Sequence, residues 1–425
     1  MKLTKEEKSW VTYDWANSVY ATIMVAAIFP IYFTTMSRAS VQAGDYWWGI
    51  ATSISTVVLA VCSPLFGALA DYKGWKKKLF CAFLAVGILF TLLSAFWSSW
   101  PLLLLGYVVS HVGWSGTLLM YDSFLTDVTS RERMDRLSTI GFACGYIGGS
   151  TIPFVISILL ISFGSKFGLS GTTPVRISIV LTAVWWGIFS IPLLRNVKHR
   201  HDSGAPPKAF LRTTFQSILK TAKDILHERA LLIFICAYFF YIDGVGTVIG
   251  MATAYGSTLG LDSTGMIVAL MVTQLVGVPS ALLFGHLSGK TSSLRLIRFS
   301  VVMYIFICVL GFIMGFGLEE SYFGVNTALT IFWILAILVG TVQGGIQAVS
   351  RSYFGKLVPP ERSGEYFGFF DIFGKFAAIM GPLLYSIVRN ATGRSSYSIL
   401  SIIALFAVGF FILAAGRKQL DAGKA

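Results

Sequence analysis

The chain of 425 residues carries little charge for its length. Only 12% of its residues are charged and 55% are hydrophobic, whereas a soluble protein keeps roughly 25% charged residues to stay hydrated. Apolar segments of about 20 residues recur along the whole chain, and a helix of that length crosses a hydrocarbon core of about 30 Å. This composition excludes an ordinary soluble globular protein and predicts an all-α integral membrane protein.

Cysteine is also scarce, and its arrangement excludes two further classes. None of the five cysteines belongs to a CxxC pair or to a cluster with metal-ligand spacing. They are Cys62, Cys81, Cys144, Cys236 and Cys308. We predict packed thiols, with no disulfide, no metal and no cofactor. His199 and His201 are the alternative metal ligands, but a charged run beside the membrane accounts for them better.

Twelve apolar segments are long enough to cross the membrane. They cover residues 10–36, 46–70, 79–98, 101–126, 138–163, 174–194, 231–256, 264–288, 296–317, 326–350, 366–389 and 396–416. The first segment is too long for the apolar core of a signal peptide and lacks a small-residue cleavage site. We therefore expect this segment to stay in the mature protein.

Lysine and arginine are distributed unequally between the two sides of these spans. The side that carries both termini holds 27 of them and the opposite side holds five. This asymmetry is typical of membrane proteins and places both termini in the cytoplasm. It also explains the net charge of +13 without nucleic acid, because no aromatic-basic platform or soluble domain carries that charge.

The two halves of the chain share residues at a fixed interval. Asp14 and Asp243 lie 229 residues apart. The same interval joins Glu132-Arg133 to Glu361-Arg362, Gly145 to Gly374 and Pro153 to Pro382. A membrane chain made of two equivalent halves is the usual frame of a solute carrier. We predict one six-helix bundle at 1–194, a cytoplasmic linker at 195–230 and a second six-helix bundle at 231–425.

The linker contains a candidate amphipathic helix. Its apolar residues recur at helical spacing and its basic residues fall elsewhere on the helix. The apolar set is Leu211, Phe215, Ile218, Ala222 and Ile225, and the basic set is Arg212, Lys220 and Lys223. This pattern predicts a helix that lies on the inner leaflet of the membrane.

The loop after the second span has a distinctive composition. It reads Gly67-Ala68-Leu69-Ala70-Asp71-Tyr72-Lys73-Gly74-Trp75-Lys76-Lys77. Gly67 allows close helix contact, Gly74 permits a tight turn, and lysines such as Lys76 hold the loop at the anionic inner surface. Asp71 can accept hydrogen bonds from a helix N-terminus or from an inner-face arginine. The alternative is an ordinary helix-end acid.

Two motifs suggest enzymes, and neither has the required context. The run Gly285-His286-Leu287-Ser288-Gly289-Lys290-Thr291 has one residue too few for a phosphate-binding loop and follows an apolar helix instead of a strand. His111 and Ser115 lie one helical turn apart, as a base and a nucleophile would, but nothing supplies an oxyanion hole. We predict no enzymatic activity.

Polar residues within the spans are the candidate solute and coupling site, because a charge at mid-membrane costs about 2.5–3.5 kcal/mol. His111 and Asp243 lie near the midplane by residue count, and Gln343 and Gln347 share one face of the tenth span. The alternatives are a histidine bonded to a backbone carbonyl and, for Asp243, a helix–helix hydrogen bond.

Four further polar residues lie in the first and eleventh spans. Asp14 and Asn17 share the first span, although Asp14 is close enough to its start to meet the positive end of its own helix. Lys375 lies deep in the eleventh span, with Asp371 one turn before it. This lysine would attract a substrate carboxylate, while the acids would hold an amine or a proton. The alternative is a pair that only neutralises itself.

Several strings in the chain resemble one transporter family. They are Tyr13-Asp14-Trp15-Ala16-Asn17-Ser18, Tyr241-Ile242-Asp243-Gly244, the glycine-rich run 141–149, the run 343–352 that ends in Ser350-Arg351-Ser352, Phe367-Gly368-Phe369 and Gly374-Lys375. Together they resemble the vacuole-effluxer-like branch of the major facilitator superfamily, whose fungal members export amino acids from the vacuole. The compact length resembles the bacterial members, which lie in the cytoplasmic membrane.

The resemblance implies specific roles for these residues. The first, fourth, seventh and tenth spans would line a central cavity, so Asp14, Asn17, His111, Asp243, Gln343 and Gln347 would converge there. The loop motif resembles the signature of the superfamily, in which the acid helps to close the cytoplasmic side. The candidate gate is therefore Gly67, Asp71, Gly74, Lys76 and Arg351. Tyr72 and Trp75 replace the usual basic residues, which leaves the salt-bridge part of that closure open.

We predict a secondary transporter that moves a small polar or zwitterionic solute, with amino acids as one candidate, by alternating access. Proton coupling is a hypothesis that rests on Asp243, Asp14 and His111. The alternatives are export of a sugar or drug and, more remotely, an intramembrane enzyme or a receptor. We expect a monomer in contact with membrane lipids and a small-molecule substrate, with no nucleic-acid partner.

Overall fold

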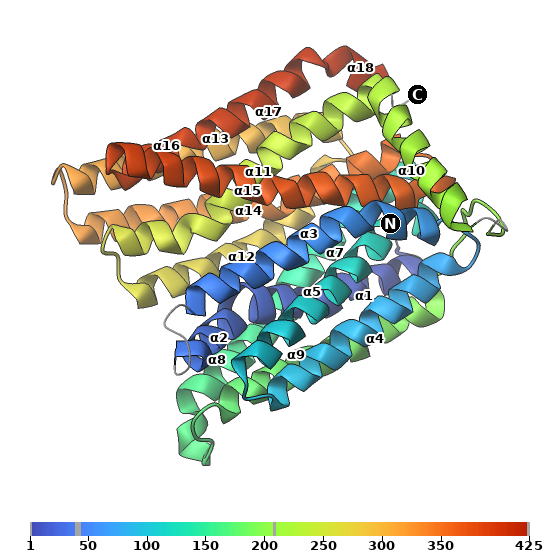
Figure 1. Ribbon diagram of the computed structural model, residues 1–425. Coiled ribbons are helices and arrows are strands. Elements are labelled where there is room, and N and C mark those ends of the chain that lie inside the picture. The colour runs from blue at the N-terminus through green and yellow to red at the C-terminus, as the bar shows by residue number, and fades with distance from the viewer. Residues whose placement is uncertain (1, 39–43, 207–209, 423–425) are drawn as a thin grey trace. The chain divides into compact units, whose positions relative to one another are not determined.

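The computed structural model describes residues 2–38, 44–206 and 210–422. Within these ranges the regular secondary structure is helical and contains no strand. Twelve stretches of helix are long and apolar enough to cross a membrane, and most of the long ribbons in Figure 1 belong to them. The prediction of an all-α membrane fold with twelve spans is confirmed.

The chain divides into two compact units, and each combines segments from both halves of the sequence. Unit 1 comprises Met1–Arg131, Cys144–Leu219 and Pro359–Ile372. Its helices are α1 (Lys5–Tyr20), the π-helix η1 (Ala21–Ala27), α2 (Ile28–Arg38), α3 (Gly44–Ala70), α4 (Trp75–Phe96), α5 (Trp100–Ser123), α6 (Leu125–Val128), the π-helix η3 (Gly145–Thr151), α8 (Ile152–Phe163), the 3-10 helix η4 (Gly164–Phe167), α9 (Thr173–Asn196) and the 3-10 helix η5 (Pro360–Arg362).

Unit 2 comprises Glu132–Ala143, Lys220–Val358 and Phe373–Ala425. Its helices are α7 (Met134–Cys144), α11 (Arg229–Thr258), α12 (Ser263–Leu287), α13 (Ser293–Glu319), α14 (Val325–Leu357), α16 (Ser395–Ser401), α17 (Ile403–Ala415) and α18 (Arg417–Ala422). The short 3-10 helix η2 (Arg131–Arg133), α10 (Phe210–His227) and α15 (Ser363–Thr392) contribute residues to both units.

Two segments therefore belong to the unit that is built mainly from the other half of the sequence. Glu132–Ala143 comes from the first half and belongs to unit 2, and Pro359–Ile372 comes from the second half and belongs to unit 1. The domain boundaries at residues 194 and 231 stay a prediction. Both segments bind residues of the candidate gate within their unit: Asp71 contacts Gly364 in unit 1, and Arg351 contacts Ser138 in unit 2.

The first helix begins earlier than the sequence pattern predicts. Thr4 caps α1: its hydroxyl accepts from Glu7 N, and the Glu7 carboxylate accepts from Thr4 N over 2.8 Å. This capping box starts the helix at Lys5, five residues before the predicted span. Asp14 then lies more than two turns inside α1, so the interpretation of Asp14 as a helix-end acid is wrong.

Small residues determine the packing within unit 1. α1 packs against α9 and η3, and α4 packs between α5 and α9 (Figure 1). A Cβ on Gly148 would collide with the Trp15 ring, and one on Gly149 with Ser18. The glycine-rich run of the fifth span thus allows α1 to approach η3 closely, as small residues do between membrane helices.

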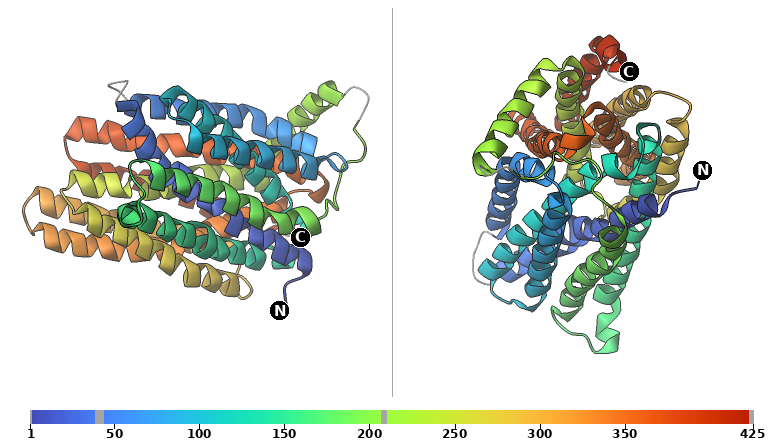
Figure 2. Two further views of the ribbon diagram at one scale, coloured as in Figure 1. Left: turned by 90° about the horizontal axis from the view of Figure 1, so that it is seen from below. Right: turned by 90° about the vertical axis from the view of Figure 1, so that its right-hand side faces the viewer.

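The helices of unit 2 pack in a comparable arrangement. α14 packs along α12 and α13, and α11 packs along α17. Figure 2 shows α12, α13 and α14 in gold and orange from two further directions. The largest buried side chains there include Tyr241, Tyr304 and Tyr353, which fill the space between the helices.

Candidate functional site

Asp14 is bonded to a neighbouring helix within unit 1. The Tyr121 hydroxyl of α5 donates to Asp14 Oδ2 over 2.7 Å, and the Asn17 amide nitrogen lies 3.5 Å from Asp14 Oδ1. Asp14 and Asn17 are both buried. The Trp114 indole donates to the Asn17 carbonyl over 3.2 Å. The two predicted polar residues therefore lie together, around a phenol donor that the sequence analysis did not identify.

His111 lies on α5 among aromatic rings. Its ring centroid is 5.4 Å from that of Tyr107 and 5.6 Å from that of Trp114. The same Trp114 bonds to Asn17, so His111 and the Asp14 cluster share a neighbour. The Tyr107 ring stacks on the imidazole and the Trp114 ring is tilted against it, so both restrict the orientation of His111.

Asp243 is fully buried in α11 of unit 2. The Gly381 amide of α15 donates to Asp243 Oδ1 over 3.0 Å, so the helix–helix hydrogen bond considered as an alternative is present. The Thr247 hydroxyl donates to the Asp243 carbonyl over 2.7 Å and lies 3.5 Å from Oδ1. Within the described part of the chain, Oδ2 has no hydrogen-bond partner. One oxygen of this carboxylate remains available to a proton or a cation.

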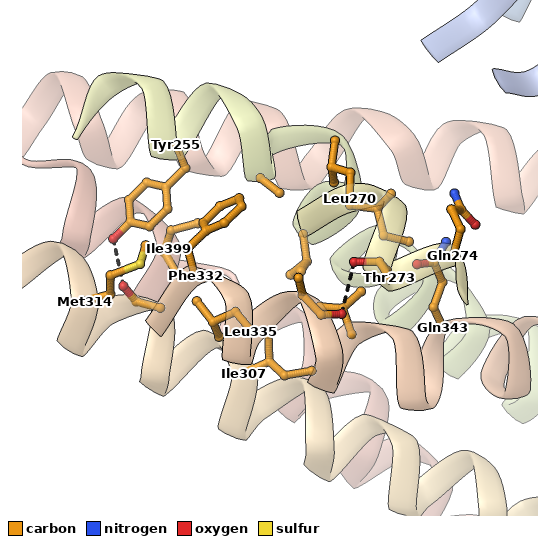
Figure 3. A pocket seen from close by; sticks show the side chains of 16 residues that line it. Tyr255, Leu270, Thr273, Gln274, Ile307, Met314, Phe332, Leu335, Gln343 and Ile399 are labelled. Atoms are coloured by element: carbon orange, nitrogen blue, oxygen red, sulfur yellow. Dashed lines mark hydrogen bonds between the residues drawn. The ribbon is translucent and has the colours of Figure 1, made fainter. Parts of the chain in front are cut away.

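The two glutamines of α14 lie together, and one of them lines a cavity in unit 2. The Gln347 amide donates to the Gln343 carbonyl over 3.2 Å. Gln343 also lines an apolar cavity of about 110 Å³ with Gln274, Thr273 and Tyr255. Figure 3 shows Gln274 and Gln343 at one end of this cavity and Tyr255 at the other. The cavity combines two amide groups with an apolar interior.

The two charged residues predicted in the eleventh span both lie on α15. The Ser63 hydroxyl of α3 donates to Asp371 Oδ2 over 2.6 Å, within unit 1. A Cβ on Gly368, one turn earlier, would lie 2.7 Å from the Ser63 carbonyl, so α15 approaches α3 closely here. Lys375 follows one turn after Asp371 and belongs to unit 2. Asp371 is therefore bound to α3, a contact that the sequence did not predict.

Asp71 binds the first turn of α15 within unit 1. The Gly364 amide donates to Oδ1 over 2.7 Å and the Glu365 amide donates to Oδ2 over 2.9 Å. These N–H groups have no partner inside their own helix, and the positive end of the helix dipole faces the acid. The predicted acceptor geometry is thus present, with a helix N-terminus as the donor.

The two glycines of the loop motif have the geometry that the sequence predicts. A Cβ on Gly67 would collide with the Gly364 carbonyl, so α3 and α15 touch through their backbones. Gly74 has φ 75°, a left-handed conformation that other residues adopt only with strain. This turn separates α3 from α4 and presents Asp71 to α15.

Lys76 is a correction to the sequence analysis. It does not face the membrane surface, because its side chain is fully buried. Its ammonium donates to Asp127 Oδ2 over 2.8 Å and to the Ser363 hydroxyl over 3.0 Å. Asp127 also accepts from the Arg200 and His201 amides over 2.9 Å each. A buried ammonium needs such partners, so Lys76 joins α4, the end of the fourth span and the start of α15.

Arg351 holds a segment within unit 2. Its guanidinium donates from Nε to the Ser138 hydroxyl over 2.9 Å and from Nη2 to the Ser138 carbonyl over 3.2 Å. It also lies over the Phe142 ring, 4.7 Å from the centroid. Arg351 therefore binds the segment Glu132–Ala143 within unit 2.

A second group of contacts holds the same segment in unit 2. Asp135 accepts from the Ser352 hydroxyl over 2.5 Å and from the Ser293 hydroxyl over 2.7 Å. Lys356 Nζ lies 2.5 Å from Asp135 Oδ2. Asp135 is buried. The Lys356 ammonium neutralises its charge, and the two hydroxyls satisfy its oxygens.

The sequence analysis missed Asp127, Asp135, Glu365 and Lys356, although the repeat contains a signal for two of them. Asp127 and Lys356 lie 229 residues apart, which is the interval of the repeat. Each ends a span and pairs with a residue of opposite charge. Equivalent positions of the repeat therefore carry opposite charges, and each of the two residues forms an ion pair in its own unit.

Burial changes the protonation of Asp71, which lies just outside the second span. Removal from water raises the pKa of Asp71 to about 7, and the neighbouring Glu365 carboxylate adds to that rise. The Lys76 ammonium and the two amide donors oppose it. Asp71 is consequently close to half ionised at neutral pH, so small changes in its surroundings change its charge.

The comparisons with known proteins identify the family. A family model described as "Vacuole effluxer Atg22 like" matches residues 49–419. The MFS-type transporter YxiO of Bacillus subtilis is 43% identical over 420 residues, which cover 97% of this chain and 95% of YxiO. The chain belongs to the Atg22-like family. The resemblance inferred from the sequence is confirmed.

The fungal members of the Atg22-like family are longer. Autophagy-related protein 22-1 of Aspergillus clavatus is 27% identical over 322 residues, which cover 71% of this chain and 52% of the fungal protein. Autophagy-related protein 22 of Botryotinia fuckeliana is 27% identical over 296 residues, with 65% and 49% covered. This chain spans about half the length of these fungal relatives.

Solved structures confirm the fold of this Atg22-like chain. The human organic anion transporter MFSD10 matches 96% of the chain and 99% of its own length with a TM-score of 0.70, at 14% identity. The proton:xylose symporter XylE matches 97% of the chain and 95% of its own length with a TM-score of 0.71, at 10% identity. The chain is a multi-pass MFS-type transporter with the predicted major facilitator fold.

Proposed function

We propose that this chain is a secondary active transporter that moves a small polar or zwitterionic solute by alternating access. The observation that carries the proposal is the contact of Asp71 with the Gly364 and Glu365 amides. This contact depends on two hydrogen bonds to one side chain that titrates near neutral pH. Such a contact can break and re-form between two states of similar free energy, which a gate requires.

Charges of both signs within the spans support a zwitterionic solute. Asp14 and Asp243 are buried acids, and Lys375 lies on α15. A zwitterionic solute carries one group that acids attract and one group that a lysine attracts, so both of its charges match charges within the spans. The family description as a vacuole effluxer and the resemblance to amino-acid exporters make amino acids the first class to test.

Proton coupling is the second part of the proposal. Asp243 has one oxygen bonded to Gly381 and a second oxygen with no hydrogen-bond partner among the described residues. Such a group is stable when a proton or an ammonium neutralises it. Asp14 and His111 would complete the coupling groups, because Trp114 of α5 connects them. Its indole donates to Asn17, the neighbour of Asp14, and its ring lies against His111.

The cellular setting follows from the charge distribution and the family. The excess of lysine and arginine on one side of the spans favours both termini in the cytoplasm. The similarity to a Bacillus protein over nearly the whole chain supports the cytoplasmic membrane as the location. We propose a monomer, with substrate and protons as the transported species.

A counterflow assay tests this function. Purified protein in proteoliposomes is loaded with one unlabelled amino acid at a time, and uptake of the labelled form is followed. We expect saturable uptake for a subset of amino acids, faster under an imposed pH gradient. Asp243→Asn should remove the response to the gradient. Asp262→Asn is the matched control, because Asp262 is exposed and caps α12 through Gly265, a role that asparagine also fills.

Two results would contradict the proposal. Absence of counterflow for every amino acid, with folded protein in the vesicles, would refute the amino-acid part. An unchanged response to the gradient in Asp243→Asn would refute the coupling role of Asp243.

A further inference from the structure

The helix α10 has an unusual exposed face. It lies in the chain between α9 and α11, outside the candidate spans, and Figure 2 shows it as a separate helix. Phe215 is 61% exposed, Leu219 is 63% exposed and Leu226 is 62% exposed. These positions fall within one narrow arc of the helix, since successive residues are about 100° apart. An apolar strip outside the membrane spans needs a partner.

The other faces of α10 are arranged in a definite order around this strip. Thr214, Thr221 and Ile225 are buried on one side of it. The exposed basic residues on the opposite side are Arg212, Lys220 and Lys223. The sequence predicted Phe215 and Ile225 on one apolar face, but the structure separates them into an exposed edge and a buried edge. The helix thus presents a buried face, an apolar strip and a basic edge in turn.

We propose that α10 binds anionic phospholipid at the membrane surface, and that this binding stabilises the contact between Asp71 and α15. The apolar strip would enter the acyl-chain boundary, and the basic edge would meet the lipid phosphates. The charge of the basic edge favours an anionic membrane over a second protein. The part that concerns the gate rests on the proposed function.

The buried side of α10 connects it to the candidate gate. The Tyr72 hydroxyl lies 3.4 Å from the Thr214 hydroxyl, and Tyr72 directly follows Asp71. The Ser217 hydroxyl donates to Glu365 Oε2 over 3.0 Å, and the Glu365 amide is one of the two donors to Asp71. All these residues belong to unit 1. A helix held at the membrane would keep both ends of the Asp71 contact in place.

Hydrogen exchange of the full chain tests both parts without a known substrate. The protein is placed in nanodiscs of phosphatidylcholine alone or with phosphatidylglycerol, and amide exchange is followed in α10 and at Gly364 and Glu365. We expect phosphatidylglycerol to slow exchange in α10 about tenfold and at the two gate amides several-fold. A triple variant, Phe215→Gln with Leu219→Gln and Leu226→Gln, should lose both effects. Phe167→Gln, at a phenylalanine 81% exposed in η4, should keep them.

Ser217→Ala separates the two parts of the proposal. It removes the bond to Glu365 and leaves the apolar strip intact, so α10 should still respond to phosphatidylglycerol while the gate amides no longer do. Equal exchange of α10 in both lipids would overturn the lipid site. Protection of α10 by a second copy of the chain instead of by phosphatidylglycerol would also overturn it. In the unsubstituted protein, a response in α10 without a response at the Gly364 and Glu365 amides would overturn the coupling between lipid binding and the gate. Counterflow in phosphatidylcholine vesicles tests the transport function independently.

Discussion

Two equivalent segments of the repeat are held by different chemistry. Pro359–Ile372 binds in unit 1 through backbone N–H groups that donate to Asp71. Glu132–Ala143 binds in unit 2 through its own acid, Asp135, which side chains surround. In unit 1 the acid, Asp71, lies outside the bound segment Pro359–Ile372. In unit 2 the acid, Asp135, belongs to the bound segment Glu132–Ala143 itself.

This difference indicates which contact acts as the switch. Lys76 and Ser63 also hold the unit 1 segment, through Ser363 and Asp371. Both N–H groups at the start of α15, however, donate to a single carboxylate, that of Asp71. The unit 2 contact is shared among Ser352, Lys356 and Arg351, so the loss of one donor leaves the others. We infer that the unit 1 contact opens first and that the unit 2 contact is the more persistent.

The largest expected effect concerns the two lysines. Lys76→Ala should destabilise the protein by about 3 kcal/mol, because it leaves the fully buried Asp127 without its counter-ion. Lys356→Ala should cost roughly 1–2 kcal/mol, because the Lys356 side chain is 17% exposed and its ion pair with Asp135 is less buried. Thermal unfolding followed by a thiol-reactive dye reports both, since Cys308 is buried in the fold.

Lys77→Ala is the control for this pair. Lys77 is partly exposed, and its ammonium donates to the Val197 carbonyl and to no carboxylate among the described residues. Its loss should therefore have little effect. Equal stability of Lys76→Ala and Lys77→Ala would contradict a buried ion pair at Lys76.

The second prediction concerns the acceptor of unit 1. Asp71→Ala leaves two buried N–H groups without an acceptor, at about 1–3 kcal/mol each, so opening of the contact should increase tenfold or more. Hydrogen exchange at Gly364 and Glu365 measures it. Ser352→Ala, which removes one of several donors in unit 2, should leave those amides unchanged. Full protection of both amides in Asp71→Ala would refute the role of this acceptor.

The third prediction compares Gly67 with Gly285, which lies 218 residues later in the same Gly-x-Leu context. A Cβ on Gly67 would meet the Gly364 backbone, whereas a Cβ on Gly285 would meet the Thr139 hydroxyl. A side chain can rotate away and a backbone cannot, so Gly67→Ala should cost about 1–3 kcal/mol and Gly285→Ala clearly less. Unfolding midpoints of the two variants decide it. A larger effect for Gly285→Ala would show that the close approach at Gly67 is unimportant.

The fourth prediction concerns the pH dependence of the unit 1 contact. Burial raises the pKa of Asp71 to about 7, so the closed contact holds its proton more tightly than an open, hydrated Asp71 does. The closed state is therefore favoured at low pH and loses stability as pH rises from about 4 to about 7, with no further loss above that. Asp71→Asn should remove this dependence.

Other titrating groups near Asp71 can be distinguished from it. Glu365 is a buried acid beside Asp71, and Glu365→Gln should reduce the dependence without removing it. Burial and the Lys76 ammonium lower the pKa of His199, so His199 is less protonated in this range than a free histidine. A pH dependence that persists unchanged in Asp71→Asn would assign it to another group.

The sequence predicted the features that lipid and local geometry determine. The twelve spans follow from apolar length, and Gly74 and Asp71 follow from the turn and the helix end that they serve. It could not predict the contacts that tertiary packing creates. Lys76 has the composition of a surface lysine, and only the fold brings Asp127 and Ser363 to its ammonium. The binding of Asp371 to Ser63 joins positions 308 residues apart, for the same reason.

The most direct test of this account is a distance measurement across the unit 1 contact. Spin labels at Lys73 and Glu361, both exposed, lie on either side of the bonds from Gly364 and Glu365 to Asp71. In proteoliposomes the account predicts two distance populations, with the longer one increased by Asp71→Ala and by a rise in pH from 5 to 8. A single distance that neither the substitution nor the pH changes would contradict a gate at Asp71.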